Sequence, residues 1–282
     1  MEFFKITSYA KINLSLNVIK KLPNNYHKIE SLVTFVNLSD EIYIRPIKSK
    51  KNKIFFYGNF SKGIRKINSI SKTFKILNKF NLIKKKKFEV KIKKNIPQKS
   101  GMGGGSMNSA SILNYLLKKK VIKVSTQKLF KICSLIGSDV ILGLAKKNSI
   151  LFSDKKVSRL KLKINLPVLI VKPRFGCSTK KIYNNVHKFT KSQYKKSKNE
   201  YFNIENLIKS GNDLERVTYK IYPGLRNLNI FLSKMNNVIF TRMTGSGSAI
   251  VAYFKSDRAL KIAVKKFKSK YKNYWYITSK TI

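Results

Sequence analysis

The feature that most constrains the fold is a glycine-rich run between a strand pattern and a helix pattern. The run reads Ser-Gly-Met-Gly-Gly-Gly-Ser over residues 100–106. Apolar and charged residues alternate over 88–92, which predicts a half-buried strand ending at Pro97. Residues 108–117 are apolar on enough sides to predict a buried helix. Glycines let backbone N–H groups approach an anion and a helix N-terminus attracts it, so the junction predicts a phosphate-binding loop.

Known glycine-loop motifs do not match this run. No Gly-Lys-Ser/Thr closes it as in a Walker A loop, and the dinucleotide-binding spacing with its downstream acid is missing. The catalytic-loop and magnesium-loop motifs of protein kinases are absent as well. Taken alone, the run also fits a flexible connection.

Strand and helix patterns are mixed throughout the chain. Polar and apolar residues alternate from residue 5 to 18, which predicts a half-buried strand with Lys11 and Asn13 on its polar face. Pro23-Asn24-Asn25 predicts a turn. Further strands are expected at 32–38, 41–44, 166–171, 238–241 and 248–254, and further helices at 69–80, 126–136 and 259–267. Residues 188–199 are polar and lysine-rich and are expected to form a mobile connection.

The class is therefore α+β, and the length of 282 residues favours two domains. The composition shifts near residues 154–163, before an apolar strand pattern. We place the boundary there, with an N-terminal domain over 1–158 and a C-terminal domain over 159–282.

The charge invites a nucleic-acid interpretation. The formal net charge is +49, from 61 Lys plus Arg against 12 Asp plus Glu. Lysine is spread along the chain, however, and the other abundant residues, Asn, Ile, Phe and Tyr, share its A/T-rich codons. Codon drift explains this composition without selection for RNA, although an RNA-binding protein stays open as an alternative.

Cysteine content and hydropathy predict a cytoplasmic protein without a membrane partner. Cys133 and Cys177 are the only cysteines and do not form a C-x-x-C pair, so neither a disulfide framework nor a zinc site is supported. No signal-peptide pattern and no long apolar run occurs.

Three segments together resemble a known enzyme superfamily. Residues 9–14, 97–110 and 243–249 occur in the order of the three motifs of the galactokinase, homoserine kinase, mevalonate kinase and phosphomevalonate kinase (GHMP kinase) superfamily. The resemblance covers nearly the full length. It implies a two-domain fold with a ribosomal-protein-like N-terminal domain, a ferredoxin-like C-terminal domain and an active site in the cleft between them. It also implies transfer of a phosphoryl group from ATP, with Mg²⁺, to a small alcohol.

Four further segments narrow the resemblance. Residues 10–14, 26–27, 136–140 and 212–215 are most similar to the branch that phosphorylates a cytidine-diphosphate alcohol. This implies a small-molecule substrate, no specific nucleic acid and a monomer or homodimer. Homoserine and mevalonate kinases are the alternatives within the superfamily, and an enzyme decaying toward inactivity is a third possibility.

The resemblance assigns the chemistry to Asp139 and Lys11. Asp139 would accept the proton of the substrate hydroxyl, and Lys11 would keep that carboxylate ionised and stabilise the transferring phosphoryl group. Each has a simpler interpretation. Asp139 follows Gly137 and fits a helix N-cap, and Lys11 fits the solvated face of a strand.

The ATP-binding residues implied are those of the loop and two flanking positions: Pro97, Gly101, Met102, Gly103, Gly104, Gly105, Ser106, Asn68 and Lys94. No dedicated metal site is assigned, and Ser106 is the candidate hydroxyl ligand for Mg²⁺. The family loop has paired serines, whereas Met107 follows Ser106 here. The missing hydroxyl is expected to lower turnover or to leave Ser106 acting alone.

The substrate-binding residues implied are Asn13, Tyr26, His27, Thr179, Tyr183, Gly245, Ser246 and Gly247. Tyr26 and Tyr183 would sandwich the cytosine while His27 hydrogen-bonds to it. Packing at a domain interface is the alternative for the tyrosines. A tight turn between strands is the alternative for the 245–247 segment.

Overall fold

The computed structural model describes residues 2–23, 26–84 and 86–282, and most of the predicted turn at 23–25 lies outside them. The chain forms two compact units, each built from several segments. Unit 1 comprises Met1–Lys11, Leu38–Gln98 and Gly103–Lys146, and unit 2 comprises Ile12–Asn37, Lys99–Met102 and Lys147–Ile282. The division at residues 158 and 159 stays a prediction.

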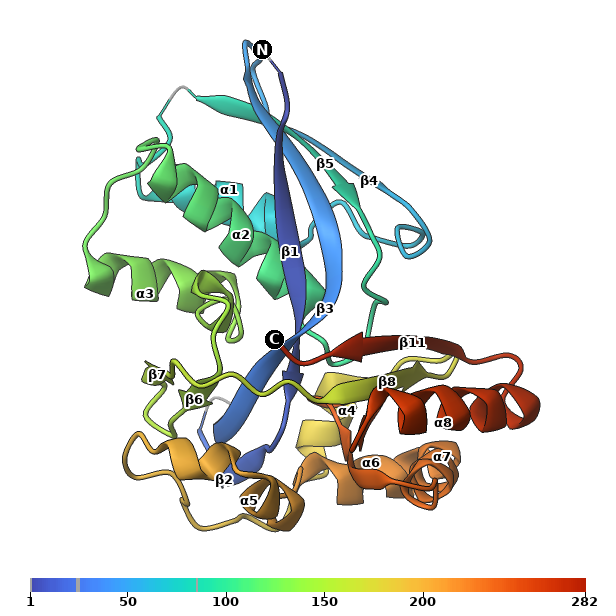
Figure 1. The fold of residues 1–282 in the computed structure, drawn as a ribbon. Helices are drawn as coiled ribbons and strands as arrows, with labels where there is room; N and C mark the ends of the chain where they lie inside the picture. The colour runs from blue at the N-terminus through green and yellow to red at the C-terminus, as the bar shows by residue number, and fades with distance from the viewer. Residues whose placement is uncertain (1, 24–25, 85) are drawn as a thin grey trace. The chain divides into compact units, whose positions relative to one another are not determined.

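Unit 1 combines long strands with three helices (Figure 1). Its strands are most of β1 (Phe4–Asn13), the second half of β3 (His27–Ile47), β4 (Lys53–Tyr57) and β5 (Lys87–Lys93). β3 is antiparallel to β5, with Glu41 opposite Lys93, and β4 is parallel to β5. The two strand segments predicted at 32–38 and 41–44 are parts of one strand. Ser39 and Asp40, which separate them, continue it, because Asp40 is buried and hydrogen-bonded within the protein rather than placed in a turn.

The helices of unit 1 are α1 (Ser69–Lys79), α2 (Gly104–Lys118) and α3 (Thr126–Ile136), followed by the short 3-10 helix η1 (Leu142–Leu144). Asn68 caps α1 through the amides of Ile70 and Ser71, and its buried stripe includes Phe74 and Leu77. Ser125 caps α3, and Gly137 ends it. The predicted limits of both helices are confirmed to within a residue.

The start of α2 differs from its prediction. The helix begins at Gly104, so Gly104, Gly105 and Ser106 belong to its first turn rather than to a loop. Gly103, with φ 67°, is the N-cap in the left-handed region, a conformation that glycine adopts at low cost. The helix was predicted to begin later, at residue 108, because glycine disfavours a helix, although the first turn of a helix tolerates glycine.

Unit 2 is built around a four-stranded antiparallel sheet. The strand order is β11 (Trp275–Lys280), β8 (Pro167–Lys172), β10 (Ile250–Phe254), β9 (Val238–Met243). Helices α7 (Pro223–Ser233) and α8 (Asp257–Lys270) pack on these strands, as the lower right of Figure 1 shows. The smaller helices are α4 (Thr179–Asn184), η2 (Asn199–Phe202), α5 (Ile204–Lys209) and α6 (Leu214–Ile221). The strands and the α8 helix predicted for this region are confirmed.

The first half of β3 also belongs to unit 2. It pairs with β2 (Asn17–Lys21) and with β6 (Ser149–Leu151), which in turn pairs with β7 (Val157–Arg159). Its residues Leu32 and Val33 are fully buried. This part of the strand depends on partners more than a hundred residues later in the chain.

Two sequence predictions need correction. The polar face of the first strand is exposed at Lys5 and Thr7 but buried toward its end, where Lys11 is only 3% and Asn13 only 4% exposed because both side chains have polar partners within the protein. The lysine-rich segment has no regular structure until η2 begins at Asn199, but hydrogen bonds from Thr190 to Tyr194 anchor it. Within the described residues, no helix has the length and apolarity needed to cross a membrane.

Candidate active site

An ion pair in unit 1 joins the two residues predicted to carry the chemistry. Lys11 Nζ, on β1, lies 3.1 Å from Asp139 Oδ2, in the turn after α3. The Lys11 side chain is 4% exposed, whereas that of Asp139 is 29% exposed. A carboxylate that solvent can reach, beside a buried ammonium, can accept a proton from an alcohol while the ammonium balances negative charge.

The simpler interpretations of both residues are wrong. Ile141 is the N-cap of η1, and no side chain caps that helix, so Asp139 does not act as its cap. Lys11 is not on a solvated strand face, because it is buried. Burying a lysine is costly unless a partner compensates, and Asp139 supplies that partner.

The glycine-rich segment approaches Lys11 closely. A Cβ atom on Gly103 would lie 3.0 Å from both Cγ and Cε of Lys11, so a larger residue would displace the lysine. No side chain caps α2, and its first turn contains no acidic residue. The backbone N–H groups of that turn are therefore suited to an anion such as a phosphate.

A buried carboxylate that the sequence analysis missed organises this region. Asp40 is fully buried and accepts hydrogen bonds from the amides of Asn95 and Ile96, both at 2.8 Å, and from Asn108 Nδ2 at 2.9 Å. It also forms an ion pair with Lys94. Asp40 thereby ties the segment before the glycine run to helix α2. The chain has only 12 acidic against 61 basic residues, so the rarity of an acid was the signal in the sequence that could have pointed to Asp40.

The flanking residues predicted to border ATP have structural partners. Lys94, paired with Asp40, has its Nζ 3.3 Å from the position of a Cβ on Gly104. Asn68 Oδ1 accepts the amide hydrogens of Ile70 and Ser71 as the α1 cap. Lys94 lies beside the glycine segment, and the capping role explains Asn68 without a ligand.

Met107 is buried rather than exposed at the start of α2. Its side chain is 2% exposed, and its Sδ lies 3.0 Å from where a Cβ on Gly143 would be. Ser106, by contrast, is partly exposed in the first turn of the helix. The missing second hydroxyl therefore corresponds to a core-facing position, and Met107 contributes packing there.

In unit 2, Asn13 holds the small-residue turn after β9. Its Oδ1 accepts from the amide of Gly245 at 3.0 Å, and its backbone amide donates to Thr244 Oγ1 at 3.1 Å. Its Nδ2 donates to Ser31 Oγ at 2.8 Å. The side-chain oxygen serves the turn and the side-chain nitrogen serves β3, so Asn13 orders the site rather than presenting a vacant amide.

The same turn packs against the first part of the glycine run. Thr244 Oγ1 donates to the carbonyl of Gly101 at 3.2 Å, and a Cβ on Gly101 would come within 1.9 Å of the Thr244 carbonyl oxygen. The amide of Ala249 donates to the carbonyl of Ser100 at 3.2 Å. The turn after β9 therefore lies against residues 100–101 of the glycine run.

Asn212 is a second residue that the sequence analysis left without a site role. Its Nδ2 donates to the carbonyls of Met243 and Gly245, at 2.7 and 2.8 Å. On the other side of the turn, Ser246 Oγ and Thr179 Oγ1 are 2.8 Å apart. The predicted substrate residues Thr179, Gly245 and Ser246 are therefore neighbours in space.

An aromatic cluster surrounds His27. The centroid of the His27 ring lies 5.0 Å from that of Tyr183 and 6.4 Å from that of Phe189. Tyr26, the preceding residue, is 71% exposed, and Phe189 is 45% exposed. Phe189 was not predictable as a site residue, because it lies in a polar segment without a periodic pattern.

The imidazole of His27 is arranged to form a hydrogen bond in its uncharged state. Its Nε2 is buried and has no hydrogen-bond partner within the described part of the chain. Burial, and secondarily the charge of Lys21, lower the pKa of His27 below its ordinary value of 6.5. At neutral pH the ring is therefore uncharged and can donate to or accept from a neutral heterocycle.

The family of the chain follows from sequence comparison. The profile of the GHMP kinases N terminal domain matches residues 68–146, and that of the GHMP kinases C terminal domain matches residues 198–273. A curated protein from Pelagibacter ubique (strain HTCC1062), named 4-diphosphocytidyl-2-C-methyl-D-erythritol kinase, is 49% identical over 282 residues and all of both chains. The chain is a GHMP kinase. Its resemblance to the superfamily, drawn from motifs alone, is confirmed, as is the enzyme class.

A more distant relative bears the same name. The protein from Clostridioides difficile (strain 630) is 30% identical over 291 residues, which cover 99% of this GHMP kinase and 96% of the relative. ATP is the phosphoryl donor that membership of the kinase family implies.

Solved structures share the fold of this GHMP kinase. A crystal structure of 4-(cytidine 5'-diphospho)-2C-methyl-D-erythritol kinase has a TM-score of 0.75 at 20% identity and covers 98% of this chain and 99% of that one. A homoserine kinase from Cytophaga hutchinsonii has a TM-score of 0.72 at 16% identity, covering 100% and 95%. The predicted two-domain GHMP kinase fold of class α+β is confirmed.

Proposed function

We propose that this GHMP kinase transfers the γ-phosphoryl group of ATP to the 2-hydroxyl of 4-diphosphocytidyl-2-C-methyl-D-erythritol, a step of non-mevalonate isoprenoid biosynthesis. The observation that carries the proposal is the 49% identity, over the full length, to a curated kinase of that name. The Lys11–Asp139 pair supports it, because such a pair suits direct transfer to an alcohol.

Asp139 serves as the general base for the substrate hydroxyl. Lys11, 3.1 Å away, balances the charge that develops on the transferring group. The uncapped amides at the start of α2 bind the phosphates of ATP, and Gly103, Gly104 and Gly105 keep side chains out of their way. Pro97, before the run, and Met102, within it, are both buried and support its shape, and Lys94 and Asn68 border it.

Mg²⁺ accompanies ATP in this proposal. The described residues contain no group of three His, Cys, Asp or Glu side chains arranged to hold a metal. The hydroxyl of Ser106, partly exposed in the first turn of α2, is an oxygen donor of the kind that Mg²⁺ uses when phosphates and water supply its other ligands. Ser106 would help to hold the ion, which would supply neutralisation of the phosphate charge.

The aromatic cluster recognises the cytosine. The exposed rings of Tyr26 and Phe189 offer the surface on which a flat base can stack. Tyr183 contacts the ring of His27 and thereby supports the imidazole. The unpartnered Nε2 of His27 hydrogen-bonds to the base. Thr179, Ser246 and Gly247 line the path of the diphosphate. Phe189 thus takes the second-wall role that the sequence analysis gave to Tyr183.

Several accompanying properties are part of the same proposal. The enzyme acts in the cytoplasm as a monomer or homodimer, without a specific nucleic-acid or membrane partner. The surplus of lysine reflects codon usage rather than RNA binding.

A coupled ADP-release assay tests the substrate. The purified protein is offered the cytidyl alcohol beside galactose, homoserine and mevalonate, each with ATP and Mg²⁺. We expect turnover with the cytidyl alcohol alone. Turnover of homoserine or mevalonate without the cytidyl alcohol would replace this proposal by another GHMP activity, and saturable, sequence-selective RNA binding without any transfer would replace the enzyme class.

A further inference from the structure

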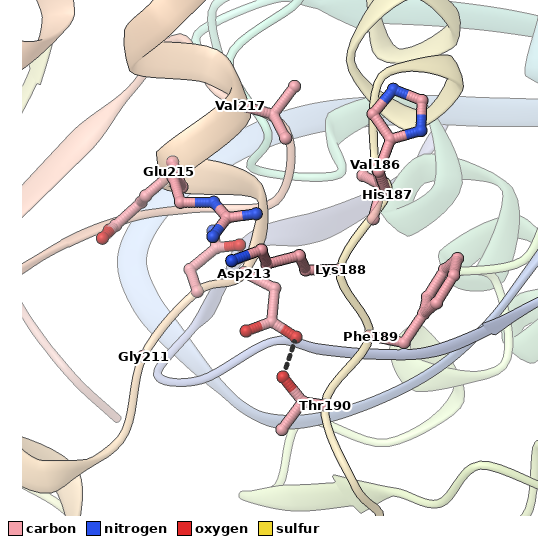
Figure 2. Close-up of a pocket in the computed structure, with 11 residues that line it drawn as sticks. Val186, His187, Lys188, Phe189, Thr190, Gly211, Asp213, Glu215 and Val217 are labelled. Carbon is pink, nitrogen blue, oxygen red and sulfur yellow. Dashed lines mark hydrogen bonds between the residues drawn. The ribbon is translucent and has the colours of Figure 1, made fainter.

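Residues 187–194, here called the strap, lie between α4 and η2 in unit 2. They form no helix or strand. The strap carries Phe189, the exposed ring beside His27. Behind its first residues is a pocket of about 340 Å³, lined on the other side by residues 211–213 and 215–217 (Figure 2). Core packing does not fill the space behind this part of the strap, so its position depends on polar contacts.

One set of contacts goes to Asp213. Its Oδ2 accepts from Thr190 Oγ1 at 2.7 Å and from the amide of Val18 at 2.7 Å. The amide of Thr190 donates to the carbonyl of Val18 at 2.9 Å. Figure 2 shows Lys188 and Thr190 directed toward Asp213, while Phe189 leaves the strap on the opposite side. Fixing Thr190 therefore fixes the direction of the neighbouring phenyl ring.

A second carboxylate, this one buried, holds the strap two and three residues after Thr190. Glu30, which is fully buried on β3, accepts from the amide of Gln193 at 2.6 Å and from Ser192 Oγ at 2.8 Å. Tyr194, 5% exposed, has its hydroxyl 2.7 Å from Ser15 Oγ. β3 also begins with His27, so one strand carries both the base-binding imidazole and the anchor for the strap.

We infer that Thr190, Asp213 and Glu30 are positioning residues that hold Phe189 as the wall of the base-binding site. A ring on an untethered polar loop would have to be ordered when the base binds, which weakens binding. Charge-assisted hydrogen bonds order it beforehand. The inference rests on the proposed function, because it assumes that the aromatic cluster receives the cytosine.

The test uses Thr190→Val, which keeps the size of the side chain and removes its donor, and Thr190→Ser, which keeps the donor. We expect Thr190→Val to raise KM for the cytidyl alcohol about five- to tenfold, the order of the net contribution of one hydrogen bond. The KM for ATP and kcat should stay near the wild-type values. Thr190→Ser should restore most of the lost affinity.

A double-mutant cycle with Phe189→Ala separates positioning from general damage. If Thr190 acts through the ring, Thr190→Val should have little further effect once the ring is gone. An equal rise of KM in both backgrounds would overturn the inference, as would a rise in the KM for ATP of the same size. Glu30→Gln, which keeps an acceptor for Gln193, provides a second variant should Thr190→Val fold poorly, and its KM should rise in the same selective way.

The wild-type protein tests the proposed function, and the variants test the role of Thr190, Asp213 and Glu30. Wild-type protein that does not phosphorylate the cytidyl alcohol would overturn the proposed function, and the inference falls with it. Active wild-type protein whose KM is unchanged by Thr190→Val and by Glu30→Gln would overturn the inference and leave the proposed function intact.

Discussion

Among single residues, the Lys11–Asp139 pair is the arrangement on which turnover depends. Only one of its members is reachable by solvent, since the Asp139 side chain is 29% exposed and that of Lys11 is 4% exposed. This asymmetry leaves the carboxylate to meet the substrate and keeps the ammonium in a setting where its charge is weakly screened.

Asp139→Asn should abolish turnover, with a loss of at least about a thousandfold, because the amide cannot accept the proton. ATP binding should stay near normal, as measured by calorimetric titration. Asp154→Asn is the matched control, since Asp154 also lies 3.1 Å from a lysine, Lys156, but on the surface. Turnover close to wild type in Asp139→Asn would refute its assignment as the base.

His27 should make substrate affinity depend on pH. Its pKa lies below 6.5 in the folded protein because burial, then Lys21, disfavour the charged ring. KM for the cytidyl alcohol should rise as pH falls through that lowered pKa, and the folded state should lose stability from about 6.5 downward because the unfolded chain binds the proton more readily. Steady-state kinetics between about pH 5 and 8 measure the profile. His27→Asn should remove the step, whereas His187→Asn, on an exposed position, should keep it.

At the scale of elements, the site depends on short segments that meet without side chains between them. The turn after β9 lies directly against residues 100–101, and Asn13 and Asn212 hold that turn from two directions. Turn chemistry and the helix pattern made the glycine run and the small-residue turn predictable. Their contact joins residues more than 140 positions apart, which periodicity does not encode.

Gly101→Ala should damage the enzyme far more than Gly63→Ala. Both glycines have positive φ, 78° and 80°, so alanine costs about 1 kcal/mol of backbone strain at either. At Gly101 the new Cβ would also come within 1.9 Å of the Thr244 carbonyl oxygen, whereas nothing lies within 4 Å at Gly63. We expect a lower Tm and a large loss of kcat/KM only for Gly101→Ala. Equal melting temperatures for the two variants would contradict the contact.

The strap shows a different limit of prediction. Its polar, lysine-containing composition is typical of a mobile connection, which the sequence predicted over residues 188–199. The residues that fix it, Glu30 and Asp213, lie far away along the chain and look like ordinary polar positions. Local composition cannot reveal a hydrogen bond whose acceptor is supplied by another element.

For the whole molecule, the formal charge of +49 is the dominant physical property. With 61 basic and 12 acidic residues, most lysines have no acid to pair with, and they repel one another in the compact state. Fold class, motif order and enzyme class were nevertheless predictable, because apolar periodicity and glycine positions are independent of this surplus.

Moderate salt should therefore stabilise the protein. Raising NaCl from about 20 mM to about 300 mM shortens the Debye length from about 20 Å to about 6 Å and screens the repulsion, so Tm should rise by several degrees. Differential scanning fluorimetry measures it. The gain should level off above about 0.5 M, where screening is already complete. A Tm that falls or stays flat over the lower range would show that lysine repulsion does not limit stability.

The split of β3 between the two units has a consequence for biosynthesis. Residues 27–37 pack with residues 147–282, so their partners are still unmade when the first half of the chain emerges from the ribosome. Leu32 and Val33 stay exposed to solvent until β6 and the segments after it have been synthesised. A nascent chain stalled before residue 147 should be a target for chaperones, and a fragment ending there should be insoluble, however well unit 1 folds.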